Sequence, residues 1–267
     1  MSNELAIQET KLPAPAQSGM GIQAVARAEI DAQVATAREY PRDVSRAIKQ
    51  AMGLATMDRE TAARMFYAMK DGQPVKGMPK GAELGPSVRL TEVFMSSYGN
   101  LQCGSRIVEI GDEHVVVAGF AHDLENNTRV VCEETASILT REGRRYGERM
   151  VIRTAQAAMA KARRNAILQV IPRVFIERVM KSAIGVAAGL DKPKTERWRD
   201  LVLRFASRNI ADKQMLALIE RTGIADMNDD DFAYLESCLA QIIDGDTTID
   251  ALLQGEVIDN KASDLTS

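Results

Sequence analysis

Arginine residues gather between positions 141 and 164, where their spacing suits contacts with a chain of phosphates. The alanine-rich stretch from 147 to 171 predicts a long helix that Pro172 ends. At 100° per residue, Val151, Ala155 and Ala162 share the side that packs, whereas the arginines fall on the other side. The predicted contacts with a nucleic-acid backbone are Arg141, Arg144, Arg145, Arg149, Arg153, Lys161, Arg163 and Arg164. An ordinary solvated helix surface remains the alternative interpretation of this basic face.

Tyr146 lies among these arginines and offers a flat ring on which a nucleotide base can stack. A half-buried core aromatic explains Tyr146 equally well, so both interpretations stay open.

A second group of basic residues surrounds a segment rich in glycine, proline and lysine, between Lys70 and Ser87. Its glycine spacing resembles a nucleotide-binding loop, but Met78 and Pro79 stand where that loop needs Lys and Ser or Thr. We therefore expect no nucleoside triphosphate hydrolysis, and the segment is either a flexible loop or a contact for backbone phosphate. The candidate DNA-binding residues outside the long helix are Lys76, Lys80 and Arg89.

Catalytic chemistry has weaker candidates in this sequence. His114 and His122 are an even number of residues apart on a predicted strand, with carboxylates nearby, but no third ligand stands at a recognised spacing. No sequence resembles the Gly-x-Ser-x-Gly turn of a hydrolase nucleophile, and the three cysteines share no C-x-x-C spacing. We predict no catalytic residue, no metal site and no cofactor.

Charge is strongly segregated along the 267 residues, although the net charge is only −3. Residues 136–205 carry 16 basic and 6 acidic residues, whereas residues 206–267 carry 4 basic and 13 acidic residues. This pattern indicates a polyanion partner for the basic block, or two helical surfaces of opposite sign that pair with each other. Collagen, full-length disorder and a disulfide scaffold are excluded by composition. With no apolar run of about 18 residues and no signal sequence, we expect no membrane contact and a reducing cytoplasm.

The pattern of breaks and hydrophobic periodicity predicts an α+β fold. Three strands, near 106–110, 114–120 and 129–138, form an antiparallel β-meander packed on the long basic helix. An N-terminal helical lead-in precedes it, with helices over 22–38, from Pro41, and from Asp58 to Lys70, and Ser87 caps a short helix that ends at Gly99. The predicted divisions are a disordered leader (1–20), a nucleic-acid-binding and oligomerisation core (21–190), a linker (191–194), a small acidic all-helical module (195–253) and a tail (254–267).

Several short strings are familiar as a set. They are Glu29-Ile30-Asp31-Ala32-Gln33, Tyr40-Pro41-Arg42, Gly85-Pro86-Ser87-Val88-Arg89-Leu90-Thr91-Glu92, Tyr98-Gly99-Asn100, Asp123-Leu124-Glu125-Asn126-Asn127 and Ala162-Arg163-Arg164-Asn165-Ala166-Ile167. Over residues 29–190 the chain resembles phage and prophage single-strand DNA annealing recombinases of the RecT, Red-beta and Erf kind. The resemblance implies rings or helical filaments of identical chains that hold DNA in a basic groove without ATP, in a bacterial host cytoplasm. It also implies that residues 195–253 dock an exonuclease or a single-strand-binding protein.

Our leading hypothesis is therefore an ATP-independent protein that binds single-stranded DNA and anneals it to its complement, leaving a duplex. Arginines would neutralise the repulsion between two phosphate chains, so no covalent chemistry is required. One rival is a metal-dependent nuclease or nucleic-acid-modifying enzyme built on His114 and His122. The other is a phage assembly protein whose basic helix meets an acidic protein partner.

Overall fold

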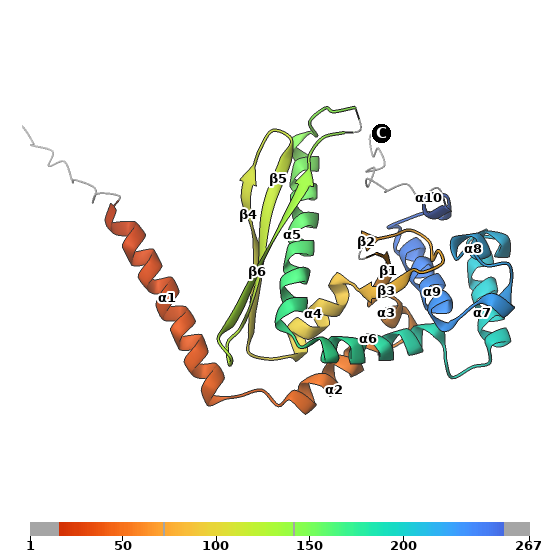
Figure 1. Ribbon diagram of the computed structural model, residues 1–267, viewed down its shortest axis with the longest axis horizontal. Coiled ribbons are helices and arrows are strands. Elements are labelled where there is room, and N and C mark those ends of the chain that lie inside the picture. Colours follow the sequence, from red (N-terminus) through yellow and green to blue (C-terminus); the bar gives the residue numbers. More distant parts are fainter. Residues whose placement is uncertain (1–15, 72, 141, 254–267) are drawn as a thin grey trace, which may run out of the picture.

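The computed structural model describes residues 16–71, 73–140 and 142–253, and shows a mixed α+β fold (Figure 1). A tall antiparallel sheet and one long helix form one part, and smaller helices surround a second, short sheet beside them. No helix within the described ranges is both long and apolar enough to cross a bilayer. The predicted tail at 254–267 and most of the predicted leader lie outside the described residues, whereas residues 16–20 already belong to the first helix.

The main sheet is the predicted meander. It contains β4 (Leu101–Ile110), β5 (His114–Asp123) and β6 (Thr128–Ser137) in that order, all antiparallel. Helix α5 (Glu148–Val170) covers one face of this sheet, where Val115, Val117 and Ala121 of the central strand are fully buried. Side chains alternate between the two faces along each strand, and those of β6 on the other face, such as Val131, are exposed. The α+β fold, the three-stranded meander and the long helix packed on it are therefore confirmed.

The N-terminal helices are α1 (Ala16–Glu39), α2 (Val44–Ala55) and α3 (Arg59–Ala63). Asp58 caps α3 as expected, accepting a hydrogen bond from the Thr61 amide at 2.6 Å. The prediction that this helix runs to Lys70 is wrong, because β1 (Phe66–Lys70) begins three residues after α3 ends.

Strand β1 is the centre of a second sheet, in which it pairs with β2 (Gln73–Pro74) and β3 (Glu83–Pro86). Both partners lie in the segment that was expected to be only a loop. Phe66 and Ala68 of β1 are buried in the core, so tertiary packing and pairing with two short strands decide its conformation over local propensity. Ser87 then caps α4 (Val88–Ser97), and Gly99 follows with φ of 74°, as the sequence predicts.

The C-terminal helices share one hydrophobic core with the N-terminal part. Helix α6 (Arg173–Ala188) packs on α2, α3 and α9 (Asp229–Asp244), and buried core residues run from Ile48 to Leu252. The predicted linker at 191–194 is a surface turn that leads into α7 (Lys194–Ala206), and the helices on its two sides share this core. The remaining short elements are α8 (Asp212–Leu218), a 3-10 turn (Ile224–Asp226) and α10 (Ile249–Leu253).

A buried ion-pair cluster, which we call the Arg42 cluster, joins the bend between α1 and α2 to the lower end of the main sheet. The Arg42 guanidinium contacts the carboxylates of Asp123 and Glu125, and it lies 4.0 Å from the centre of the Tyr98 ring. Asn100 donates hydrogen bonds to Glu125 and to the Tyr40 carbonyl, at 2.6 and 2.9 Å. Three of the short strings noted in the sequence, 40–42, 98–100 and 123–127, therefore meet at one point and set the direction in which α1 leaves the body.

Candidate nucleic-acid interface

Helix α5 is a rigid platform because it lies very close to the main sheet. Its buried side is made of small residues, including Ala155, Ala158 and Ala162, and the facing position on the central strand is Gly119. Any side chain at Gly119 would collide with the backbone of α5 at Ala162. The predicted alanine face is therefore confirmed, and the side chains on the opposite side of α5 project from a fixed helix.

Two arginines of the predicted row stand out as unneutralised. Arg149 is exposed and Arg153 is partly exposed, and neither forms an ion pair within the part of the chain that the structure describes. They are four residues apart, so they lie one above the other on the outer side of α5. Arg144 is also exposed, in the turn just before the helix. This pair and its neighbour form the cationic part of the outer face of α5.

Arg145 has a structural role instead. Its guanidinium donates hydrogen bonds to the carbonyl oxygens of Gly111 and Asp112, at 2.5 and 3.0 Å, and lies 3.7 Å from the Asp112 carboxylate. These two residues form the turn between β4 and β5. Arg145 therefore ties that hairpin to the start of α5 and is partly neutralised there.

The basic residues near the end of α5 are also partly neutralised. Lys161 forms an ion pair with Glu134 of β6 at 2.9 Å, and Arg163 lies 3.9 Å from Glu92 of α4. Arg164 donates hydrogen bonds to the Asn165 side chain, and it forms no ion pair with a carboxylate in the described chain. The charge available to a ligand thus falls along the helix from its first half to its last.

Two aromatic residues lie near this surface, and only one of them was a candidate from the sequence. Tyr146 is half buried and packs against the small core between α5 and the main sheet, which fits the core alternative. Tyr67, which sequence reasoning missed, lies on β1 with its ring 5.3 Å from the Arg164 guanidinium. Its sequence context was interpreted as helix, so no spacing signal pointed to it.

The other candidate residues lie apart from the Arg149 and Arg153 pair. The Lys76 ammonium donates a hydrogen bond to the Ala251 carbonyl at 3.2 Å, and Arg89 pairs with Glu92 at 3.0 Å while 66% of its side chain stays exposed. Lys80 is exposed. Arg141 lies outside the described residues.

Opposite charges of the basic block and the C-terminal segment do pair in several places. Arg204 contacts Glu236 and Arg197 contacts Asp229, whereas Asp231 is fully buried against Arg221 of its own segment. Burial raises the pKa of the Glu236 carboxyl, and the Arg204 and Arg59 guanidinium groups oppose that shift. Glu236 and Asp244 also contact Arg59 and Arg64 of the N-terminal part, so some carboxylates of residues 195–253 are neutralised from outside the segment.

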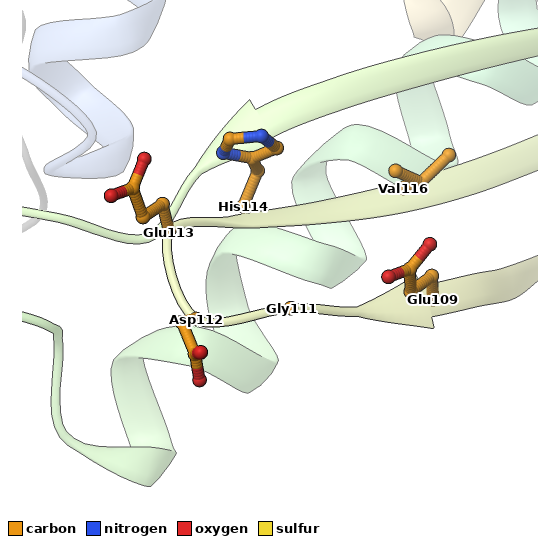
Figure 2. A pocket seen from close by; sticks show the side chains of 6 residues that line it. All are labelled: Glu109, Gly111, Asp112, Glu113, His114 and Val116. Carbon is orange, nitrogen blue, oxygen red and sulfur yellow. The ribbon is translucent and has the colours of Figure 1, made fainter.

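The histidines that a hydrolytic or metal site would use do not meet. His114 begins β5 beside the hairpin turn, whereas His122 lies near the other end of that strand and forms a 3.0 Å hydrogen bond with Asn127. Figure 2 shows the cavity beside His114, where the Asp112 carboxylate points away from the imidazole. Among the described residues, no three His, Cys, Asp or Glu side chains are grouped so that they would hold a metal ion.

Of the predicted row, Arg149 and Arg153 on α5 therefore remain the main candidates for contact with a ligand. Arg144 lies just before the helix, and Arg164 lies further along it. A row of this kind on a rigid helix is suited to backbone phosphates, since guanidinium groups bind phosphate oxygens in fixed geometry. Comparisons with protein-family models, with curated proteins and with solved structures find no match to this chain.

Proposed function

We propose that this protein binds single-stranded DNA along the outer face of α5 and anneals it to a complementary strand without ATP. The observation that carries the proposal is the pair Arg149 and Arg153, which project from a helix fixed on the sheet and have no carboxylate partner in the described chain. An arginine that is already paired with a carboxylate attracts a phosphate only weakly, whereas the charges of these two arginines are not neutralised by such a pair.

Annealing requires only that a protein hold strands and reduce the repulsion between them. A cationic row releases counterions from one strand, and several chains side by side extend that row. The resemblance noted in the sequence supports this proposal, which includes a ring or filament of identical chains in a bacterial host cytoplasm. Docking of an exonuclease or single-strand-binding protein on residues 195–253 belongs to the same proposal.

Fluorescence anisotropy with a labelled single-stranded oligonucleotide, measured over a series of salt concentrations, tests the binding step. Each phosphate contact to a single strand contributes about 0.7 to the slope of log affinity against log salt. The double variant Arg149→Ala and Arg153→Ala removes two contacts, so the slope should become shallower by about 1.4. A double variant whose affinity and salt slope equal those of the natural protein would refute this site.

Arg208→Ala with Lys213→Ala is the matched control. Arg208 is exposed in the turn after α7 and Lys213 is exposed on α8, so the control removes two positive charges from another surface. We expect the control to bind single strands like the natural protein. Equal losses in both double variants would indicate a response to net charge alone, and would also count against a site on α5.

A further inference from the structure

Helix α1 makes almost no contact with the rest of the chain. From Ala24 to Thr36 its side chains are exposed, except that Ile30 and Val34 are partly covered, and Ala37 is the first buried one among those described. Figure 1 shows α1 leaving the body at its lower end and pointing away from the main sheet. A helix without tertiary contacts is only marginally stable in water. Packing against another surface would therefore stabilise α1.

One side of α1 is suited to such packing. Ala26, Ile30, Val34 and Ala37 follow one another at spacings of four, four and three residues, so they form a narrow apolar stripe along the helix. Val25 lies on the other side of the helix and is 59% exposed. We therefore expect a partner surface to pack against the stripe and not against the other sides of α1.

The uncovered face of the main sheet has the complementary character. Strand register places Val116 and Phe120 of β5 on this face, with Val131 of β6 directly opposite Phe120. A Cβ on Gly104 of the neighbouring strand would lie only 2.8 Å from the Phe120 ring, so the ring fills the space above that glycine. Every second side chain of β6 points to this face, and each of these is exposed; Val131 is 53% exposed. Val116 and Phe120 are half-buried and Ala118 between them is 3% exposed, so the apolar surface that is open to solvent is centred on Val131.

The two surfaces match in length. Helix α1 has 24 residues, or about 36 Å, and each strand of the main sheet has 10 residues, or about 34 Å. Helix α5, with 23 residues, already spans the other face of this sheet.

Charged residues of both signs border both surfaces. Arg27, Glu29 and Asp31 lie beside the α1 stripe. On the sheet face, Arg106 and Arg129 lie on the strands to the two sides of Phe120, and Glu109 and Glu133 share that face opposite Val116 and Ala118. Arg129 stacks on the Phe120 ring at 4.9 Å. Both surfaces thus have an apolar strip bordered by charges of both signs, which can form ion pairs around it.

We propose that α1 of one chain packs on the open face of the main sheet of a second chain. The buried Arg42 cluster holds α1 away from its own sheet, so the contact forms between chains. A helix on one chain and a sheet on the next are different surfaces, so the contact repeats head to tail and produces a ring or a filament. The inference deepens the proposed function, on which it rests, by naming the contact that would join the cationic faces of successive α5 helices.

Light scattering after size-exclusion chromatography of the full chain tests this contact. We expect the natural protein to elute as assemblies heavier than the 29.3 kDa chain. Ile30→Glu with Val34→Glu should disrupt the stripe, and Val131→Glu should disrupt the sheet face, so each variant should elute as a single chain. Val25→Glu is the matched control on the other side of α1 and should assemble like the natural protein.

Mixing the two disrupted variants makes the test directional. Each retains one intact surface, so the mixture should form a complex of two chains, with twice the mass of either variant alone. A mixture that remains single chains, a natural protein that stays a single chain at about 100 μM, or equal disruption by Val25→Glu would each overturn the proposal. Thr135→Glu, at an exposed position of the same sheet face, replaces Val131→Glu if circular dichroism shows that the latter is unfolded.

Single-strand binding by the single-chain variants separates this inference from the proposed function. Binding that remains sensitive to Arg149→Ala would leave the proposed function intact even if assembly fails. If the natural protein is a single chain and Val131→Glu abolishes strand binding, the sheet face binds nucleic acid and the contact between chains is refuted.

Discussion

Replacing Arg42 by Ala should destabilise the fold more than any exposed charge substitution. Only 4% of the Arg42 side chain and 5% of the Asp123 side chain are exposed, so removal of the guanidinium leaves the carboxylates of Asp123 and Glu125 buried together. Breaking a buried ion pair by removing one partner costs about 3–5 kcal/mol. Arg89→Ala, which breaks the exposed pair with Glu92, should cost less than about 1 kcal/mol.

Urea unfolding, followed by circular dichroism at pH 7, measures both free energies of unfolding. The pH dependence supplies a second check, because the pKa values of both carboxyls depend on Arg42. Burial by itself raises the pKa of Asp123. Hydrogen bonds from Asn126 and Arg42 lower it by more than burial raises it, so the pKa lies below its usual value. Burial likewise raises the pKa of Glu125, and hydrogen bonds from Arg42 and Asn100 bring it below its usual value.

A carboxyl whose pKa is lowered in the folded state stabilises the fold above its unfolded pKa, and this contribution is lost as the pH falls through the folded value. The destabilisation by Arg42→Ala should therefore be largest at neutral pH and should shrink below about pH 4.5, near the ordinary carboxyl range. A decrease in the free energy of unfolding of under 1 kcal/mol at pH 7, or one that does not depend on pH, would refute the conclusion that the Arg42 cluster stabilises the fold through buried ion pairs.

Two further predictions concern the packing of the core. Gly119→Ala should separate α5 from the main sheet, because the added methyl group collides with the Ala162 backbone, and we expect a loss of about 1–3 kcal/mol in urea unfolding. Gly53→Ala, in helix α2 with no atom within 4 Å of the new Cβ, should stabilise the fold by up to about 1 kcal/mol, and equal losses in both variants would contradict the close approach of α5. Burial raises the pKa of the Cys238 thiol to about 12, so this thiol should not react with a thiol reagent at pH 8 until the protein unfolds, and rapid labelling of Cys238 in the folded protein would contradict its burial.

The sequence predicts the large periodic elements of this fold well. Alternating β-branched residues and two polar turns are enough to indicate β4 to β6, and the alanine stripe from Val151 to Ala166 indicates both α5 and the side on which it packs. These signals are local, so they can be recognised without knowledge of the tertiary structure.

The small sheet could not be predicted from local signals. Strand β1 follows a correctly capped helix, and its partners β2 and β3 are two and four residues long within a segment rich in glycine and proline. Pairing with these short strands and burial of Phe66 and Ala68 in the core decide the conformation of β1, and neither is visible in its own sequence. The contact between Tyr67 and Arg164 joins β1 to α5, so it was hidden for the same reason.

The candidate site could be predicted as a surface but not residue by residue. Helical periodicity places Arg149, Arg153 and Arg164 on the outer side of α5, as in the structure. Periodicity does not reveal which charges are neutralised, because the carboxylates that pair with Lys161 and Arg163 come from β6 and α4. Periodicity likewise does not reveal that the Arg145 guanidinium binds the turn between β4 and β5.

The most direct test of the central claim is the rate at which two complementary oligonucleotides form a duplex in the presence of the protein, without ATP or divalent metal. The account predicts that the natural protein accelerates duplex formation, that salt reduces the acceleration, and that Arg149→Ala with Arg153→Ala removes most of it, while Arg208→Ala with Lys213→Ala does not. Strand binding without faster duplex formation would contradict annealing, and acceleration that survives loss of both α5 arginines would contradict the assigned surface.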